Sequence, residues 1–274
     1  MTARRPCIGV FDSGFGGLTV LKELAAAIPG ADYLYFGDTA RLPYGSKSAE
    51  TVAKYAIGAA HFLEQHHASM LVIACNTATA LALERLTAGA NVPVIGVVDP
   101  GADAAAAASR NHHVAVIGTE ATVNSHAYHK ALELRGQQVR EKACPLLVPL
   151  VEDGWAGHPV TEQVARIYLD EVFSEGFESA DVLLLGCTHY PLIKPVLHRV
   201  APQHVTIVDS AESTARAVCR KMQEDSLDGA LGDERRESPR MNFFVTDSVE
   251  KFQRLGPAFL GHAIERVEHV DLKE

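Results

Sequence analysis

The sequence predicts an α/β protein made of two pseudo-symmetric lobes, each built on a parallel β-sheet. Two observations predict this fold. Short apolar and β-branched runs alternate with segments of helical periodicity along the 274 residues. The chain also contains an internal repeat, in which an apolar strand, a cysteine, a helix, a second strand and an aspartate follow one another twice. A repeated α/β unit indicates two lobes that face each other across a cleft.

The predicted strands are short apolar runs bounded by turn residues. In chain order they span residues 7–11, 33–36, 70–74, 94–97, 113–117, 146–150, 182–185 and 206–208, with two more at 242–246 and 266–270. Helical periodicity is clearest at 17–28 and 161–173, where the apolar residues share one face. Because the strands are continuously apolar, we expect helices on both faces of each sheet. The polar and charged segment 223–239 is typical of a solvated loop.

The internal repeat sets the predicted domain boundaries. Its two copies read LVIACNTATALALERL…VPVIGVVDPG and VLLLGCTHYPLIKPVLHRV…VTIVDSAES. The cysteine and the aspartate are 24 residues apart in the first copy (Cys75 to Asp99) and 22 in the second (Cys187 to Asp209). Upstream, IGVFDSGFGG loosely matches VAVIGTEATV, and YLYFGDTARLPYG loosely matches LLVPLVEDGW. We predict a first lobe of residues 1–98 plus 210–274 and a second lobe of residues 99–209.

Composition narrows the class of protein. The hydrophobic fraction of 47% is enough for a buried core, and the net charge of −9 disfavours nucleic acid and anionic membranes as partners. No apolar stretch approaches the roughly 20 residues needed to span a bilayer, and the N-terminus lacks a signal-peptide core. The five cysteines include no C-x-x-C pair, and no Cys/His spacing supports a metal site. We therefore expect a cytoplasmic protein with reduced thiols and no bound metal.

Two of the cysteines, Cys75 and Cys187, occupy matched positions at the carboxyl ends of predicted strands. Ligands of open parallel sheets collect at this edge, so lobes that face each other bring the two thiols to opposite walls of one cleft. A thiol has a pKa of about 8.5, so forming a thiolate at pH 7 costs only about 2 kcal/mol. One thiolate could remove a proton from a substrate carbon while the opposite thiol returns one. This is the chemistry that an amino-acid racemase needs.

A single cysteine at the end of a strand is usually a small buried core residue. Cys75 and Cys187 depart from this pattern because each is followed by a polar pair, Asn76–Thr77 or Thr188–His189, at the start of a predicted helix. Hydroxyl, amide and backbone N–H groups at a helix start are natural donors to a carboxylate. The other three cysteines lack such neighbours and are interpreted as structural: Cys7, Cys144 and Cys219.

The glycine-rich segment FDSGFGGLTV begins at the end of the first predicted strand. It is a poor dinucleotide-binding motif, because the third glycine of G-x-G-x-x-G would fall at Thr19. We expect instead that its glycines let the backbone approach a small ligand, with Asp12 and Ser13 directed into the cleft.

Two other segments contain candidate residues whose simpler interpretation is structural. RLPYGSKS places Tyr44 and Gly45 in a turn-like loop, which ordinary turn chemistry also explains. Glu152 and Asp153 follow the predicted strand 146–150 as an acidic pair, although carboxylates in such places are often solvated loop charges.

Four motifs, GVFDSGFGGLTV, YFGDTARLPYGSKS, ACNTATA and GCTHYPLI, resemble those of the glutamate racemases, within the aspartate/glutamate racemase superfamily. The resemblance runs from Ile8 to about Thr214, in the family's order and spacing. It implies two pseudo-symmetric α/β lobes with the active site between them. It also implies interconversion of L- and D-glutamate without pyridoxal phosphate, a metal or any other cofactor, and supply of D-glutamate for peptidoglycan.

By the same resemblance, Cys75 removes the proton from D-glutamate and Cys187 removes it from L-glutamate. The residues implied to hold the substrate are Asp12, Ser13, Tyr44, Gly45, Asn76, Thr77, Thr188 and His189. Three ionisable residues are implied to support the acid–base chemistry of the thiols: Asp12, Glu152 and His189.

Two alternatives stay open at this point. Aspartate racemases usually carry Glu at the position of His189, which favours glutamate, but only a substrate panel distinguishes glutamate from aspartate or another amino acid. Family members often form homodimers, and some also bind and inhibit DNA gyrase. The resemblance therefore implies a homodimer and a gyrase-binding role as further expectations.

Overall fold

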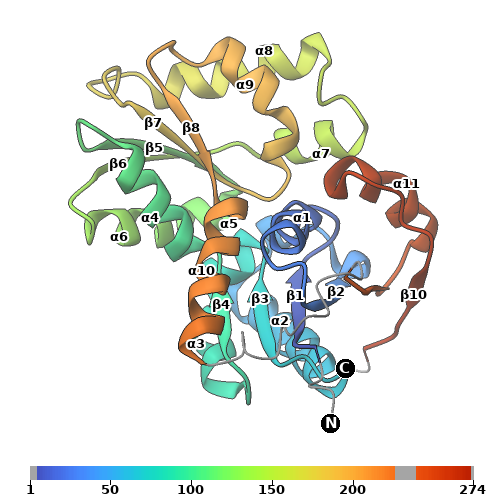
Figure 1. Cartoon of the computed structure of the whole chain (residues 1–274). Helices are drawn as coiled ribbons and strands as arrows, with labels where there is room; N and C mark the ends of the chain where they lie inside the picture. Colours follow the sequence, from blue (N-terminus) through green and yellow to red (C-terminus); the bar gives the residue numbers. More distant parts are fainter. Residues whose placement is uncertain (1–4, 226–238, 273–274) are drawn as a thin grey trace.

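The computed structural model describes residues 5–225 and 239–272, which form two β-sheets flanked by helices (Figure 1). The ten strands described are β1 (Cys7–Asp12), β2 (Asp32–Gly37), β3 (Met70–Ile73), β4 (Val94–Gly96), β5 (His113–Gly118), β6 (Gln138–Ala143), β7 (Val182–Gly186), β8 (Thr206–Asp209), β9 (Met241–Val245) and β10 (Val267–His269). Most of the predicted loop 223–239 lies outside the described residues.

The helices alternate with the strands along the chain. They are α1 (Leu18–Ala27), α2 (Ala49–Gln65), α3 (Asn76–Gly89), α4 (Val98–Ala108), α5 (Glu120–Asn124), α6 (Ala127–Glu133), α7 (Leu147–Glu152), α8 (Pro159–Val172), α9 (Lys194–Val200), α10 (Ser210–Glu224) and α11 (Val249–Leu260). Three short 3₁₀ helices lie between them: η1 (Thr39–Arg41), η2 (Tyr44–Ser46) and η3 (Tyr190–Ile193).

The two sheets share one topology. The six-stranded sheet has the order β10-β9-β2-β1-β3-β4, the four-stranded sheet has the order β6-β5-β7-β8, and the described neighbours in both pair in parallel. Strands β2-β1-β3-β4 therefore correspond in order to β6-β5-β7-β8. This arrangement confirms the predicted fold class of two parallel-sheet α/β units. The C-terminal strands β9 and β10 extend only the first sheet.

The central strands are apolar because helices cover both of their faces. Every residue of β3 and of β7 is buried, which leaves no face for polar side chains. The helices in turn are amphipathic. In α8, Ala165, Leu169 and Val172 recur at helical spacing and are buried, and Pro159 begins the helix where no N–H is needed. Burial of a leucine such as Leu169 contributes about 2 kcal/mol to folding.

The predicted strand 146–150 is wrong. Residues Leu147–Glu152 form helix α7, in which Leu147 and Val151 are buried one turn apart while Leu146, just before the helix, is 54% exposed. Pro149 sits in the first turn, where a helix tolerates proline. The spatial counterpart of β2 is instead β6, whose sequence QVREKA is polar because it is a partly exposed edge strand. The loose match between YLYFGDTARLPYG and LLVPLVEDGW therefore does not reflect the fold.

Helices from the C-terminal third join the two units. Helix α10 packs against both α1 and α4, and α11 packs against α1 and β10 while its Lys251 donates to Glu152 of α7 in the second unit (Figure 1). The glycine-rich loop after β1 also contacts the second unit. A Cβ on Gly16 would lie 2.2 Å from Oγ1 of Thr188 and 2.6 Å from Nδ1 of His189. Gly16 thus lets two protein segments approach, which differs from the predicted approach of the backbone to a ligand.

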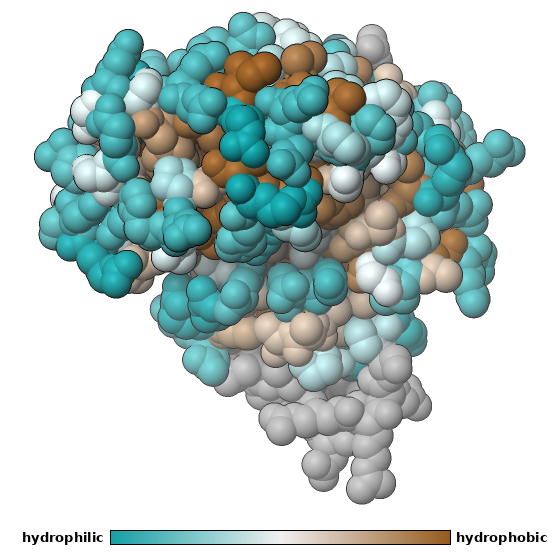
Figure 2. All heavy atoms as spheres, turned by 90° about the horizontal axis from the view of Figure 1, so that it is seen from above, coloured by the Kyte–Doolittle hydropathy of each residue, from teal (hydrophilic) through white to brown (hydrophobic). Residues whose placement is uncertain are grey.

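The surface over α8 and α9 mixes apolar and hydrophilic side chains (Figure 2). Exposed apolar residues near α7 and α8 include Leu146, Trp155 and Ile167. Within the described ranges, 5–225 and 239–272, no helix has the length and apolar character to cross a bilayer.

Candidate active site

A cavity of about 380 Å³ is lined by residues from the carboxyl ends of both sheets. Ser13 follows β1 and Cys75 follows β3, whereas Thr119 follows β5 and Cys187 follows β7. In each sheet the strand order reverses between these two central strands, since later strands are added on the opposite side of the first one. Such topological switch points are where open α/β sheets bind ligands. The volume falls within the roughly 300–1,000 Å³ range of small-molecule pockets.

The predicted site residues converge on this cavity, with one exception. Those that line it are Ser13, Tyr44, Gly45, Cys75, Asn76, Thr77, Glu152, Cys187, Thr188 and His189. Asp12 is fully buried and does not line the cavity. Its Oδ2 accepts the N–H of Gly14 at 2.9 Å, and a Cβ on Gly17 would lie 2.5 Å from its Cβ. Asp12 therefore lies beneath the loop that carries Ser13.

Cys75 caps the N-terminus of α3. Its sulfur accepts the N–H of Ala78 at 3.4 Å, and its thiol donates to Oγ of Ser13 at 3.5 Å. Burial, reinforced by the nearby Asp12, raises the pKa of Cys75 to about 12. The helix N-terminus and Ser13 favour the thiolate, but burial outweighs them. At neutral pH the Cys75 thiol therefore holds its proton in this structure.

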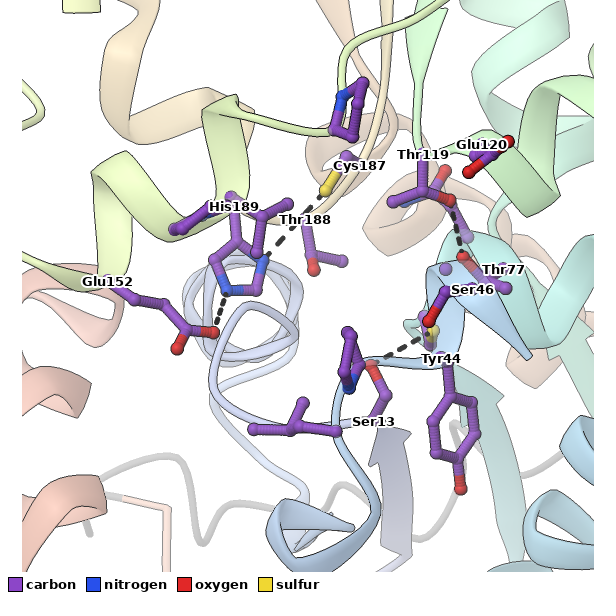
Figure 3. Close-up of a pocket in the computed structure, with 18 of the residues that line it drawn as sticks. Ser13, Tyr44, Ser46, Thr77, Thr119, Glu120, Glu152, Cys187, Thr188 and His189 are labelled. Atoms are coloured by element: carbon purple, nitrogen blue, oxygen red, sulfur yellow. Dashed lines mark hydrogen bonds and ion pairs between the residues drawn. The ribbon is translucent and has the colours of Figure 1, made fainter.

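A series of polar contacts leads from Lys251 of helix α11 to Cys187, and its part from Glu152 through His189 to Cys187 is seen in Figure 3. Nζ of Lys251 donates to Oε2 of Glu152 at 2.9 Å, and Oε1 of Glu152 lies 3.2 Å from Nε2 of His189. The other ring nitrogen of His189, Nδ1, lies 4.0 Å from Sγ of Cys187. This series of contacts connects helix α11, beside the first sheet, to the loop after β7.

The charged forms of His189 and Glu152 stabilise each other. Burial lowers the pKa of His189, but its contacts with Cys187 and Glu152 outweigh burial and raise that pKa to about 10. Burial raises the pKa of Glu152, but hydrogen bonds from His189 and Lys251 outweigh it and hold the pKa below its usual value. At neutral pH His189 is therefore a buried cation and Glu152 its carboxylate partner. A cation beside the Cys187 sulfur is a charge partner for a thiolate.

The two polar pairs after the cysteines have different local structures. Asn76 and Thr77 form the first turn of the 14-residue helix α3, as predicted. Thr188 and His189 form a turn after β7 and do not begin a helix, because the short helix η3 starts only at Tyr190. Asn76 is buried, and its Nδ2 has no hydrogen-bond partner among residues 5–225 and 239–272.

Hydroxyl groups from both sheets meet on another wall of the cavity. Oγ1 of Thr77 lies 2.9 Å from Oγ1 of Thr119 and 3.1 Å from that of Thr122, and the last two lie 2.9 Å apart. Thr77 and Thr119 line the cavity. These hydroxyls can donate hydrogen bonds to an anionic ligand.

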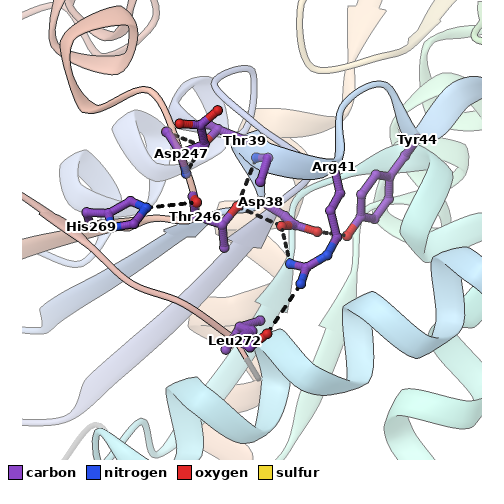
Figure 4. A network of polar contacts seen from close by, with 9 residues as sticks. Asp38, Thr39, Arg41, Tyr44, Thr246, Asp247, His269 and Leu272 are labelled. Atoms are coloured by element: carbon purple, nitrogen blue, oxygen red, sulfur yellow. Dashed lines mark hydrogen bonds and ion pairs between the residues drawn. The ribbon is translucent and has the colours of Figure 1, made fainter. Parts of the chain in front are cut away.

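The loop with Tyr44 is held by a network of polar contacts around Asp38 (Figure 4). The Tyr44 hydroxyl donates to Oδ2 of Asp38 at 2.5 Å, so this hydroxyl faces the protein. Arg41 and Thr246 donate to Oδ1 of the same carboxylate at 2.9 and 2.8 Å. Burial, reinforced by Asp38, raises the pKa of Tyr44 above its usual value. Tyr44 therefore contributes a neutral aromatic wall to the cavity.

Several lining residues were not predicted from the sequence. They are Leu42, Pro43, Ser46, Thr119, Glu120, Pro145, Val148, Pro149, Gly186 and Lys251. The repeat contained a signal for Thr119, since VAVIGTEATV matches IGVFDSGFGG and places Thr119 opposite Ser13. Nothing local in the sequence marks Lys251, whose position depends on how α11 packs.

The described residues, 5–225 and 239–272, contain no group of three or more His, Cys, Asp or Glu side chains placed to hold a metal ion. The cysteines of the chain are all free thiols. The expectation that no cofactor takes part stays a prediction.

Comparison with known proteins identifies the class. Residues 8–218 match the family model described as Asp/Glu/Hydantoin racemase. The chain belongs to this family and, within it, to the glutamate racemases, an assignment that rests on relatives matched over nearly their whole length. It is 60% identical to the glutamate racemase of Koribacter versatilis, with 99% of each chain covered. It is 47% identical to that of Geobacter metallireducens, with 97% of each covered.

Solved structures agree with this assignment. The glutamate racemase isoform RacE1 of Bacillus anthracis is 39% identical and superposes with a TM-score of 0.90, covering 97% of this chain and 98% of that one. The glutamate racemase of Francisella tularensis, solved in complex with D-glutamate, is 35% identical with a TM-score of 0.88, and 98% of each chain is covered. The chain is therefore an isomerase with glutamate racemase function, as the sequence motifs predicted.

Proposed function

We propose that this cavity interconverts L- and D-glutamate with Cys75 and Cys187 as its two acid–base groups. One observation carries the proposal. Both thiols line one cavity, and each follows a central strand at the same place in its sheet, Cys75 after β3 and Cys187 after β7. A pair of thiols that reach one ligand from different sheets is suited to work on opposite faces of one carbon.

The proposed reaction conserves atoms and charge. A thiolate at one cysteine takes the Cα proton, so an S–H bond forms while the C–H electron pair stays on the substrate carbon. The S–H bond of the other cysteine then breaks as its proton moves to the opposite face of Cα. Following the resemblance, Cys75 acts on D-glutamate and Cys187 acts on L-glutamate. Because the two sulfurs exchange protonation states, each turnover prepares the enzyme for the reverse direction.

Other cavity residues would bind and shield the substrate. The amide of Asn76 and the hydroxyls of Ser13, Thr77 and Thr188 are donors for the substrate carboxylates. Gly45 offers backbone on the same wall. Apolar residues, including Val148 and Pro149, reduce access of water to the carbanion-like centre.

Ionisable groups around the thiols would set how readily each thiol loses its proton. His189 and Glu152 hold a protonated imidazole beside Cys187. Asp12, beneath the glycine-rich loop, would act on Cys75 through its charge, because it lies outside the cavity wall.

The wider biological assignment follows from the family. We propose that the D-glutamate made here supplies peptidoglycan and that the protein works in the cytoplasm, where the free thiols stay reduced. We also propose the lobe division 1–98 plus 210–274 and 99–209. The strands support this division, because those of the first sheet lie within residues 7–96 and 241–269 and those of the second sheet lie within residues 113–209. The homodimer and the binding of DNA gyrase stay predictions.

Circular dichroism tests the activity directly. Purified protein incubated separately with L- and D-glutamate, without added cofactor, should bring both signals to zero. The same assay with L- and D-aspartate is the control for substrate choice. A higher kcat/KM for aspartate than for glutamate would overturn the proposed substrate, and unchanged signals for all four amino acids would overturn racemisation.

The two thiols can be tested one at a time. Cys75→Ala and Cys187→Ala should each abolish racemisation of both enantiomers, because every turnover needs both groups. Cys144→Ala, a change at a buried thiol outside the cavity lining, is the matched control and should retain activity. Full activity in either cavity variant would contradict the proposed roles.

A further inference from the structure

The side chain of Asn76 is only half satisfied by the protein. Its Oδ1 accepts a hydrogen bond from the hydroxyl of Tyr128 at 2.6 Å. Its Nδ2 is buried and finds no acceptor among residues 5–225 and 239–272. Asn76 is 3% exposed, lines the cavity and directly follows Cys75. A buried amide donor is costly to leave unpaired, so this N–H group is available to an acceptor on a ligand.

Tyr128 decides which end of the amide is available. An asparagine side chain can present either its oxygen or its nitrogen, and rotation about its last bond exchanges the two. The Tyr128 hydroxyl donates to Oδ1, so the oxygen end of the amide is the end directed toward helix α6. The remaining group, Nδ2, is a pure donor and suits a carboxylate. A rotated amide would instead present an oxygen to that carboxylate, which is repulsive.

The ring of Tyr128 is itself held by the loop of the second cysteine. Tyr128 is fully buried. A Cβ on Gly186 would lie 3.0 Å from Cε2 of Tyr128, so the ring packs directly against the backbone of the residue before Cys187. On its other side, a Cβ on Gly101 would lie 3.2 Å from the Tyr128 hydroxyl. The ring therefore has little freedom, and it touches the segments of both cysteines without lining the cavity.

We propose that Tyr128 is a positioning residue, which fixes the Asn76 amide so that Nδ2 donates to a carboxylate of the bound amino acid. This inference rests on the proposed function of the cavity. Tyr128 acts only through Asn76, so its loss should weaken substrate binding and leave the proton transfers largely intact. The ring contact with Gly186 does not depend on the hydroxyl.

The test compares two buried tyrosine hydroxyls. Tyr128→Phe removes the hydrogen bond to Asn76 and keeps the ring. Tyr33→Phe is the matched control, because Tyr33 is also fully buried and its hydroxyl donates to backbone carbonyls of Leu24 and Ile28, outside the cavity lining. We expect Tyr128→Phe to raise KM for glutamate roughly three- to tenfold with kcat changed less than about twofold, and Tyr33→Phe to leave both unchanged.

A double-mutant cycle shows whether the effect passes through Asn76. In an Asn76→Ala background, Tyr128→Phe should change KM no further. Asn76→Asp keeps an oxygen for Tyr128 and loses the donor, so it should raise KM even where the protein is as stable as wild type. Equal effects of Tyr128→Phe and Tyr33→Phe, or full additivity of Tyr128→Phe with Asn76→Ala, would overturn the inference.

Calorimetry with D-glutamate separates this inference from the proposed function. In a Cys75→Ala background, which stops turnover, Tyr128→Phe should raise Kd by the factor seen in KM. If wild type binds D-glutamate without racemising it, the proposed function fails and the Kd ratio alone decides the role of Tyr128. If wild type does not bind D-glutamate, both are overturned.

Discussion

At the scale of single residues, the two thiols have different electrostatic surroundings. Cys75 lies near the carboxylate of Asp12 and the hydroxyl of Ser13, and burial raises its pKa to about 12. Cys187 lies 4.0 Å from the imidazole of His189, a cation whose pKa is raised to about 10 despite burial. The pseudo-symmetry of the backbone therefore does not extend to the charges around the two sulfurs.

The raised pKa of His189 predicts a pH dependence of stability. The unfolded chain releases this proton near its ordinary value of 6.5, whereas the folded chain keeps it to about pH 10. The stabilisation is therefore fully present below about pH 6.5 and is lost as the pH rises through about 10. Urea unfolding at pH 6, 8 and 10 should show the stability advantage of wild type over His189→Asn shrinking with pH. His204→Asn, at an exposed histidine, is the control. A constant difference between wild type and His189→Asn would contradict this account.

At the scale of elements, helix α11 supplies a charge to the site of the other sheet. Lys251 donates to Glu152 of α7 and also lies 5.1 Å from the ring centroid of Phe15. Because the ammonium group helps to hold the pKa of Glu152 low, its loss should raise that pKa.

We expect Lys251→Met to move the acid limb of the pH profile of kcat/KM upward, because Glu152 must be ionised to support His189. Lys251→Arg keeps the charge and should largely restore the profile. Lys221→Met, which removes a surface pair between Lys221 of α10 and Asp225, the residue just after that helix, is the control. Identical pH profiles for Lys251→Met and Lys221→Met would show that Lys251 does not hold the charge of Glu152.

The carboxylate of Asp38 joins the Tyr44 loop to β9. It is 1% exposed and accepts hydrogen bonds from Arg41, Tyr44 and Thr246. Asp38→Ala should lower the free energy of unfolding by about 3 kcal/mol, because the buried hydroxyls of Tyr44 and Thr246 and the partly buried guanidinium of Arg41 lose their acceptor. Asp103→Ala breaks a more exposed pair with Arg135 and should cost less than about 1 kcal/mol. Equal costs in urea unfolding would show that the Asp38 network does not hold the loop.

At the scale of the whole molecule, local patterns predict best where burial dictates the sequence. Strands such as β3 and β7 are covered on both faces, so their apolar runs were found, and the cysteines after them stood out because polar residues follow. The sequence of the edge strand β6 does not predict a strand, because β6 is half exposed and polar. The apolar residues of α7 predict a strand instead of a helix, because helical and strand periodicity cannot be distinguished over five residues.

Tertiary packing decided the remaining features of the site. Lys251 reaches Glu152 across 99 positions of sequence, and no local pattern encodes that contact. Asp12 is the last residue of β1 and is fully buried, whereas Ser13 lies in the bend that follows the strand, and only Ser13 reaches the cavity. The role proposed for Tyr128 likewise depends on α6 packing against the loops of both cysteines.

Solvent deuterium labelling tests the two-thiol claim most directly. L-Glutamate is racemised in D₂O, and deuterium at Cα is measured in both enantiomers at low conversion, then the experiment is repeated from D-glutamate. Two groups on opposite faces predict deuterium in the product enantiomer, while the remaining substrate keeps its proton. Equal labelling of substrate and product at early times would mean that one group both removes and returns the proton, and would contradict the paired roles of Cys75 and Cys187.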